Sequence, residues 1–289
     1  MILWYNQTVE LLEETLIEGK RKMSKKVEIL AIDPQDDFCN PNGALFVPGA
    51  DADMSRAAAM IKRIMPRISD IHVTLDSHHN FDVAHPMYWK DTNGNHPDPF
   101  TIISASDVEN GIWTPTVPSL YKRSLEYVKA LETNQRYPLC IWPPHCIIGS
   151  KGHAVVPELF EVLSEWETTQ TAMVDYVTKG SNVYTEHYSA VVADCPDPSD
   201  PGTQINTKLI NTLVQADIII ALGEAGSHCL SNTLMDIANN FGDDSYISKI
   251  VLITDATSPV PGFEHLQDDF IKNMTGRGMQ TALAADILR

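Results

Sequence analysis

The sequence has few basic residues and no long apolar segment. Its 289 residues include 21 Lys and Arg against 38 Asp and Glu, which gives a formal net charge of -17. This excess of negative charge opposes binding to nucleic acid or to an anionic membrane surface, so neither is expected as a partner. Because no run of about 18 apolar residues occurs, a transmembrane helix is not expected either.

Cysteine is also scarce. The five cysteines form an odd set in a long chain: Cys39, Cys140, Cys146, Cys195 and Cys229. This pattern argues against a disulfide framework and predicts a reducing, cytoplasmic setting. Residues 1–22 lack the basic start and unbroken apolar stretch of a secretory signal. We treat them as an N-terminal extension that either packs at a subunit contact of a homo-oligomer or stays disordered, and 23–289 as the domain.

From Val27 onward, short apolar runs alternate with segments of helical periodicity. Strands are predicted at 27–32, 71–75, 139–142, 171–177, 216–222 and 249–254. Helices are predicted at 51–65, 118–131, 156–163, 204–215, 227–239, 264–274 and 280–288. Strands separated by helices indicate a three-layer α/β/α fold around a central, mostly parallel six-stranded sheet. The segment around 86–139 is a long insertion into this pattern.

One stretch combines a buried strand, a glycine-containing turn and a cysteine. The apolar run 218–222 is followed by Gly223 and Gly226, and Cys229 then begins a helical pattern. Backbone N–H groups at a helix start favour an anion, so this position is expected to lower the pKa of the thiol. The alternative is that Cys229 is a small buried apolar residue, and this stretch alone fits both interpretations.

Polar residues follow the predicted strands. Asp33 follows the first strand, Asp76 and His78 the second, His145 the third and Lys179 the fourth. In parallel sheets, ligands bind beyond the carboxyl ends of the strands, so these side chains are expected to share one crevice. Carboxylate and imidazole groups together can hold a divalent metal ion. The alternative is that they are helix caps and surface histidines.

Taken in chain order, these motifs resemble the isochorismatase-like cysteine hydrolases, and among them the nicotinamidases. The resemblance covers residues 27–288. The motifs that carry it are Ile32-Asp33-Pro34-Gln35-Asp36-Asp37-Phe38, Asp76-Ser77-His78, Trp142-Pro143-Pro144-His145-Cys146, Lys179-Gly180 and Gly223-Glu224-Ala225-Gly226-Ser227-His228-Cys229.

The resemblance implies a catalytic triad of Cys229 as nucleophile, Asp33 as acid and base, and Lys179 as the third member. It implies an oxyanion hole formed by the backbone N–H groups of Ala225 and Cys229, with a cis peptide at Glu224–Ala225. The reaction expected from it is hydrolysis of nicotinamide to nicotinate and ammonia in NAD salvage. A related amidase or carbamoyl hydrolase, an isochorismatase and a binding module without activity are the alternatives.

The resemblance also implies a metal site and an aromatic pocket. Asp76, His78 and His145 match ligand positions, and His85 is the candidate fourth ligand, with His79 and His96 in reserve. This donor set suits one Zn, Fe or Mn ion. The residues expected to pack around a pyridine ring are Phe38, Trp142 and His228. Two departures from the family pattern are Ser227, where many nicotinamidases have Asp, and Glu186, at a position that is often aromatic.

Overall fold

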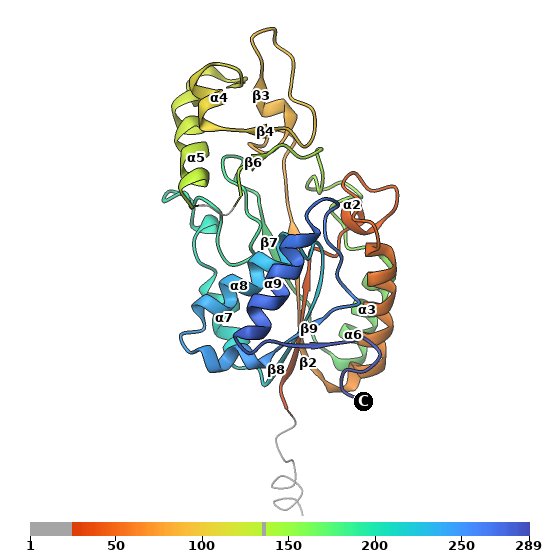
Figure 1. Ribbon diagram of the computed structural model, residues 1–289. Coiled ribbons are helices and arrows are strands. Elements are labelled where there is room, and N and C mark those ends of the chain that lie inside the picture. The colour runs from red at the N-terminus through yellow and green to blue at the C-terminus, as the bar shows by residue number, and fades with distance from the viewer. Residues whose placement is uncertain (1–24, 135–136) are drawn as a thin grey trace, which may run out of the picture.

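The computed structural model describes residues 25–134 and 137–289, so the predicted N-terminal extension lies outside the described residues (Figure 1). The elements of the main body are β1 (Val27–Ile32), α2 (Asp36–Cys39), α3 (Ala50–Ile64), β2 (Ile68–Asp76), α6 (Pro157–Gln170), β7 (Asp175–Lys179), α7 (Thr207–Val214), β8 (Ile218–Gly223), α8 (Cys229–Asn240), β9 (Ile250–Ile253), α9 (Glu264–Gly276) and β10 (Gln280–Ala282).

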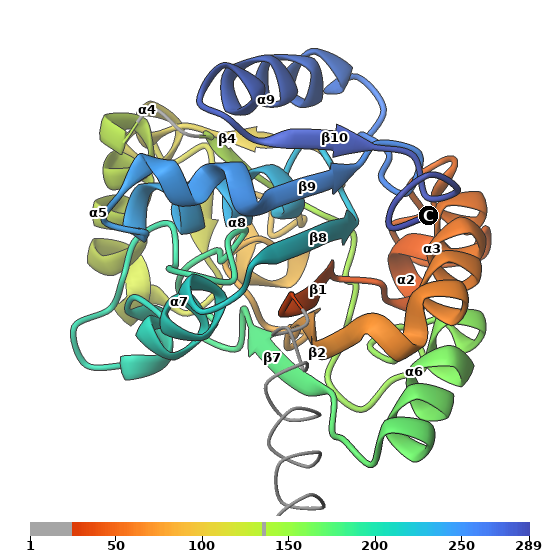
Figure 2. The same ribbon diagram turned by 90° about the horizontal axis from the view of Figure 1, so that it is seen from below.

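A six-stranded sheet forms the centre of the main body, in the order β10-β9-β8-β1-β2-β7. All of its strand pairs are parallel, which confirms the predicted α/β fold. Helices α3 and α6 cover one face of the sheet, and α7 and α8 cover the other (Figure 2). Every residue of β1 is buried, because this central strand has helices on both sides.

Two of the predicted elements are wrong. Residues 139–142 do not join the central sheet: β6 (Leu139–Cys140) pairs antiparallel with β4 (Ile102–Ile103). The sixth strand is instead β10, which lies in a segment predicted to be helical and pairs with β9 at the sheet edge. An edge strand of three residues has too few positions for alternation to distinguish it from a helical turn.

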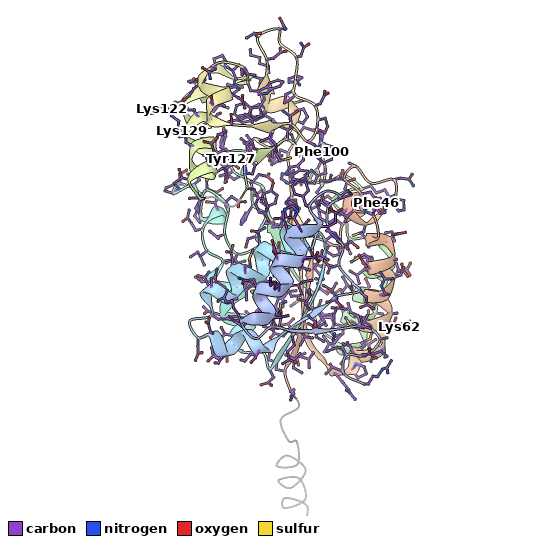
Figure 3. All side chains as sticks on the ribbon, in the orientation of Figure 1. Phe46, Lys62, Phe100, Lys122, Tyr127 and Lys129 are labelled. Atoms are coloured by element: carbon purple, nitrogen blue, oxygen red, sulfur yellow. The ribbon has the colours of Figure 1, made fainter. Side chains whose placement is uncertain are left out.

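The insertion forms a layer above the carboxyl ends of the strands (Figure 1). It contains β3 (Trp89–Lys90) paired with β5 (Thr114–Pro115), the β4–β6 pair, α4 (Ala105–Glu109) and α5 (Tyr121–Asn134). The predicted helix at 118–131 therefore exists, but its α-helical part begins at Tyr121. In Figure 3, Phe100, Lys122 and Tyr127 lie in this layer, whereas Lys62 of α3 lies far below it.

Within the described ranges, no helix combines the length and the apolar character that crossing a bilayer requires.

Candidate active site

The register of the sheet brings Asp33, Asp76 and Lys179 together at the carboxyl ends of β1, β2 and β7. Asp76 is the register partner of Lys179 across β2 and β7, so their side chains leave neighbouring strands side by side. Ile32 is the partner of Gly223 across β1 and β8, which sets Asp33 beside the turn that leads to Cys229. A Cβ on Gly223 would lie 2.1 Å from the carbonyl oxygen of Ile32, so this close approach requires glycine.

The Lys179 ammonium group contacts three polar side chains at these strand ends. Its Nζ lies 3.0 Å from Asp33 Oδ2, 3.0 Å from Asp76 Oδ1 and 3.6 Å from Cys229 Sγ. The ligand atoms of Asp33, Asp76 and Cys229 also lie within 4.8 Å of one another. A metal ion does not fit among these three, because the Lys179 ammonium group already contacts all of them. The triad predicted from the sequence therefore comes together in space.

Burial controls protonation at this site. It opposes the charge of Lys179, but Asp33 and Asp76 outweigh it and raise the pKa of the amine well above its usual value. Burial raises the pKa of Asp33, and Lys179 only partly offsets this effect. Burial also raises the pKa of the Cys229 thiol well above its usual value. The positive charge of Lys179 lowers this pKa by less than burial raises it, and the Asp33 carboxylate raises it further. The expected lowering of the thiol pKa is thus wrong, because loss of solvation outweighs the helix start.

Asp33 is held by a residue that the sequence analysis did not single out. Thr74 of β2 donates its hydroxyl proton to Asp33 Oδ1 and accepts the Asp33 N–H at 3.0 Å. These contacts leave Oδ2 to Lys179. A threonine inside a predicted strand gives no signal of this role, since β-branched residues are common in strands.

The turn before α8 presents two backbone donors. In the part of the chain that the structure describes, the N–H groups of Ala225 and Cys229 donate no hydrogen bond. The Glu224–Ala225 peptide is cis, as the resemblance implied. Two free donors beside a cysteine are suited to stabilising a tetrahedral oxyanion.

The loop after β9 holds this turn in place. The N–H of Gly226 donates to the carbonyl of Ser258 at 2.9 Å, and the N–H of Ser258 donates to Glu224 Oε2 at 3.0 Å. The Ser258 hydroxyl in turn donates to Asp53 of α3. Burial and the neighbouring Asp53 raise the pKa of Glu224 well above its usual value, which favours the protonated form of its carboxyl group in the folded protein.

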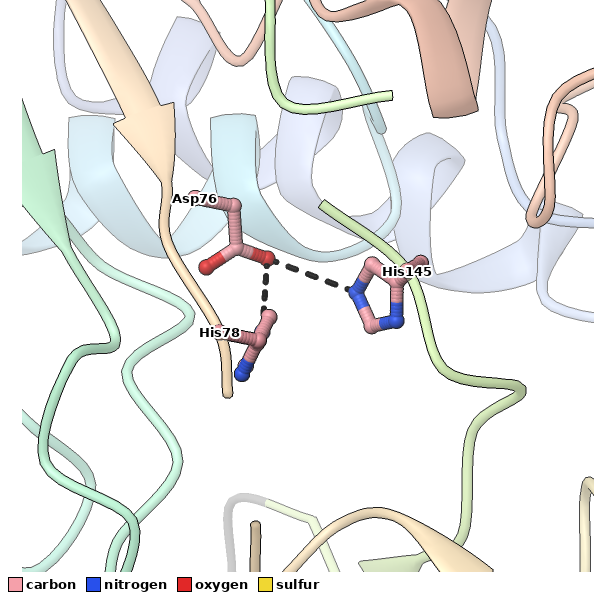
Figure 4. Close-up of side chains that lie close together, drawn as sticks. All are labelled: Asp76, His78 and His145. Carbon is pink, nitrogen blue, oxygen red and sulfur yellow. Dashed lines mark ion pairs between the residues drawn. The ribbon is translucent and has the colours of Figure 1, made fainter. Parts of the chain in front are cut away.

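Three of the predicted metal ligands form a buried group. The ligand atoms of Asp76, His78 and His145 lie within 4.8 Å of one another (Figure 4). Asp76 Oδ2 lies 3.1 Å from His78 Nε2 and 3.5 Å from His145 Nε2. His145 lies in the loop after β6. The strand before it was predicted to belong to the central sheet, but β6 belongs to the insertion.

The second nitrogens of these histidines are already engaged. Nδ1 of His78 contacts Asp82 Oδ2 at 3.1 Å, and Nδ1 of His145 donates to the carbonyl of Pro143 at 2.9 Å. Such contacts fix the orientation of each ring with Nε2 toward Asp76. Histidines that bind metal ions usually have their other ring nitrogen held by a carboxylate or a carbonyl in this way. The donor set and its surroundings therefore fit a divalent ion.

His85 lies beside this group without belonging to it. Its ring centroid is 5.0 Å from that of His78 and 5.4 Å from that of His145. Its Nδ1 donates to the carbonyl of His79 at 3.0 Å, while its buried Nε2 has no partner among the described residues. Burial lowers the pKa of His85 to about 4, so the ring is neutral. A neutral imidazole nitrogen without a partner among the described residues, next to the Asp/His group, makes His85 the candidate fourth ligand.

A pocket connects the cysteine with the Asp/His group. Its wall contains Cys229, Ala225, Asp76 and His145 together with the three predicted substrate-binding residues, Phe38, Trp142 and His228. The His228 ring is stacked on Tyr137 at 5.0 Å and meets Trp142 edge-on at 5.5 Å. Flat aromatic walls of this kind are suited to a flat ring.

No protein-family model and no curated protein matches the sequence of this chain. Solved structures do match. The nicotinamidase and pyrazinamidase of Acinetobacter baumanii is 19% identical over 92% of this chain and 100% of that chain, with a TM-score of 0.60. The chain has the nicotinamidase fold.

Two further structures with this nicotinamidase fold are similar over nearly the same length. The yeast nicotinamidase bound to the inhibitor nicotinaldehyde is 16% identical over 89% of this chain and 99% of that chain, with a TM-score of 0.61. The Pyrococcus horikoshii pyrazinamidase in complex with zinc is 18% identical over the same shares, with a TM-score of 0.53. At these identities the likeness establishes the fold.

Within this nicotinamidase fold, Glu186 is a pocket residue whose role the sequence analysis did not assign. It is buried, lines the pocket, and lies with His78 and Asp82 in a group whose ligand atoms are within 4.8 Å of one another. Burial raises the pKa of Glu186 to about 8, with His78 opposing the shift. The signal in the sequence was that glutamate stands at a position that is often aromatic in the family that the chain resembles.

Proposed function

We propose that this protein is a metal-containing cysteine amidohydrolase that hydrolyses nicotinamide to nicotinate and ammonia. The observation that carries the proposal is the convergence of Asp33, Lys179 and Cys229 beside a buried Asp/His group, at a pocket lined by Cys229, Asp76 and His145. A sulfur nucleophile, a proton acceptor and two free backbone donors are the groups that amide hydrolysis needs.

The protonation states support a concerted first step. The thiol holds its proton, and burial makes Asp33 a stronger base than an exposed aspartate. Asp33 takes the thiol proton as sulfur attacks the amide carbon and a C–S bond forms. The oxyanion receives hydrogen bonds from the N–H groups of Ala225 and Cys229. As the C–N bond breaks, Asp33 returns the proton to nitrogen, and ammonia leaves.

The second half-reaction reverses these roles. A water molecule attacks the thioester carbon while Asp33 accepts its proton. The C–S bond then breaks, and the proton on Asp33 passes to sulfur and restores the thiol. The carboxylic acid product leaves and loses its own proton to bulk water. Lys179 keeps its charge throughout, because it lies between two carboxyl groups that stabilise the ammonium form.

The residues that would hold a metal ion are Asp76, His78, His145 and His85. A bound divalent ion would supply a Lewis-acid contact for the ring nitrogen of the substrate and so orient the ring in the pocket. Phe38, Trp142 and His228 would enclose the ring faces and edges.

A second candidate is an amidase for another small amide. The specific observation that favours it is Glu186, whose pKa of about 8 keeps a protonated carboxyl group in the pocket wall. Such a group can donate a hydrogen bond to a substrate that carries a further polar substituent.

The test is ammonia release from nicotinamide, pyrazinamide and a set of aliphatic and carbamoyl amides. The wild-type protein is expected to prefer nicotinamide or pyrazinamide. Cys229→Ala should reduce turnover by about 10³-fold or more with an unchanged circular dichroism spectrum. Cys195→Ala, which changes a cysteine outside the pocket, should retain activity. Preference for a carbamoyl compound would favour the second candidate, and no turnover of any amide would indicate a binding module.

A further inference from the structure

Ser227 and His228, directly before Cys229, form a pair whose chemistry the reaction above does not use. Ser227 Oγ lies 2.8 Å from His228 Nδ1 and accepts the N–H of Val260 at 3.0 Å. Both side chains are buried, and His228 lines the pocket.

The position of one proton follows from these contacts. A buried hydroxyl group needs an acceptor for its proton, and Val260 N–H is itself a donor. Among the described residues, His228 Nδ1 is the one acceptor that contacts Ser227 Oγ. Nδ1 of His228 therefore carries the lone pair. Burial lowers the pKa of His228 to about 4, so the ring is neutral and its single N–H is at Nε2.

The Nε2–H group is available to a ligand. The ring is fixed by stacking on Tyr137 and by edge contacts with Trp142 and Phe263, the latter at 4.9 Å. In the described part of the chain, Nε2 has no hydrogen-bond partner. Donors in a largely apolar pocket fix the orientation of a ligand and discriminate between ligands that do and do not pair with them.

We propose that His228, with its tautomer fixed by Ser227, is a specificity-determining hydrogen-bond donor that selects amides with an acceptor atom on the ring edge facing it. This inference rests on the proposed function, since it concerns the substrate of the same pocket. The amide oxygen pairs with the N–H groups of Ala225 and Cys229, so the acceptor that pairs with His228 is a different atom. A heteroaromatic amide with a second ring acceptor on that edge is therefore expected to form one hydrogen bond more than nicotinamide does.

The tautomer can be tested without any activity. Nitrogen-15 NMR of histidine-labelled protein, with His228 assigned by comparison with His228→Phe, should show a proton on Nε2 and none on Nδ1. In Ser227→Asp the carboxylate can only accept, so the proton should move to Nδ1. A proton on Nδ1 in the wild-type protein would overturn the inference and leave the proposed function untouched.

Selectivity can be tested with three diazine carboxamides that keep the ring nitrogen of nicotinamide. Pyrazinamide, pyrimidine-5-carboxamide and pyridazine-4-carboxamide add the second nitrogen at different ring positions. For one of them, kcat/KM relative to nicotinamide should fall about fivefold or more in His228→Phe, which keeps a flat ring and removes the donor. The same fall is expected in Ser227→Asp at a pH where NMR shows a neutral ring.

The outcomes separate the two proposals. Unchanged ratios for all three diazines, with nicotinamide still hydrolysed, would overturn the inference alone. If the wild-type protein hydrolyses none of the four amides, the proposed function fails, and the dissociation constants of the same amides replace kcat/KM in the comparison. If none of them binds, both proposals fail.

Discussion

The Nζ atom of Lys179 lies 3.0 Å from Asp33 Oδ2, and both side chains are almost fully removed from solvent. The same ammonium group also pairs with Asp76. Removing one partner of a buried ion pair leaves an uncompensated charge, which is far more costly than the loss of a pair on the surface.

Lys179→Met is therefore expected to lower the free energy of unfolding by about 3–5 kcal/mol and to abolish ammonia release. Urea titration measures the first effect. Lys62→Met is the matched control, because Lys62 pairs with Glu165 at 2.9 Å on the exposed side of α3 (Figure 3). That variant should change stability by about 1 kcal/mol or less. An equal loss of unfolding free energy in the two variants would contradict the stabilising role of the buried ion pairs of Lys179.

Metal content should depend on His145. His145→Ala removes one of three clustered ligand groups, so affinity for Zn²⁺ is expected to fall by about 100-fold or more. Elemental analysis after dialysis and competition with a chelator measure this. His96→Ala is the control, since Nδ1 of His96 donates to the carbonyl of Trp89 in the insertion and the residue lies outside the cluster. Full metal content in His145→Ala would rule out the proposed site.

Glu224 should make stability depend on pH in an unusual direction. Its folded-state pKa is raised, so above about pH 4.5 the folded protein keeps a proton that the unfolded chain releases. Stability therefore falls as pH rises from there towards the folded-state pKa. Glu224→Gln, which keeps the acceptor for Ser258 N–H, should be more stable than wild type at neutral pH and show a flatter slope in thermal melts. A slope identical to that of the wild-type protein would contradict a protonated Glu224.

His72 should stabilise the folded protein in its charged form, because its two partners are carboxylates. It lies in β2 between Glu28 of β1, at 3.5 Å, and Asp175 of β7, at 3.0 Å, while Lys26 and Lys208 pair with the outer oxygens of these acids. Burial opposes the charge of His72, but the nearby Glu28 carboxylate and the hydrogen bond between His72 Nδ1 and Asp175 raise the pKa of His72 above 6.5.

Stabilisation by His72 is accordingly complete below about pH 6.5 and is lost as pH rises through the folded-state pKa. His72→Gln should be less stable than wild type below about pH 6.5, and the difference should shrink as the pH rises through the folded-state pKa of His72. Melting temperatures measured in parallel over a pH series test this expectation. A difference that stays constant with pH would mean that the imidazole does not gain charge in the folded protein.

Much of the fold was predictable from local patterns. The run 27–32 is apolar apart from Glu28 and forms the central strand, because a strand covered on both faces needs apolar side chains in both directions. The edge strand at 280–282 was missed because its residues are largely exposed and carry no alternation. The 139–142 run was assigned to the wrong sheet, since an apolar run of four residues does not specify its pairing partner.

The candidate site was predictable as a set of residues but not as an arrangement. The resemblance predicted roles for Asp33, Lys179, Cys229 and four metal ligands, and the structure brings these residues together except His85, whose ring lies beside the Asp76, His78 and His145 group. The supporting residues Thr74 and Ser258 were missed, and Glu186 was noted only as a departure from the family pattern, because their roles depend on contacts between segments that are distant in the chain.

The sequence by itself determined which chemical groups are present and the order in which the strands deliver them, because burial periodicity and turn residues act within a few positions of the chain. Only the tertiary structure decided the protonation states. A thiol that helix geometry alone would acidify keeps its proton in the folded protein, since desolvation and the surrounding carboxyl groups outweigh the helix start. Desolvation depends on everything that surrounds a group, and for Cys229 those surroundings come from β1, β2 and β7, whose residues lie far away in the sequence.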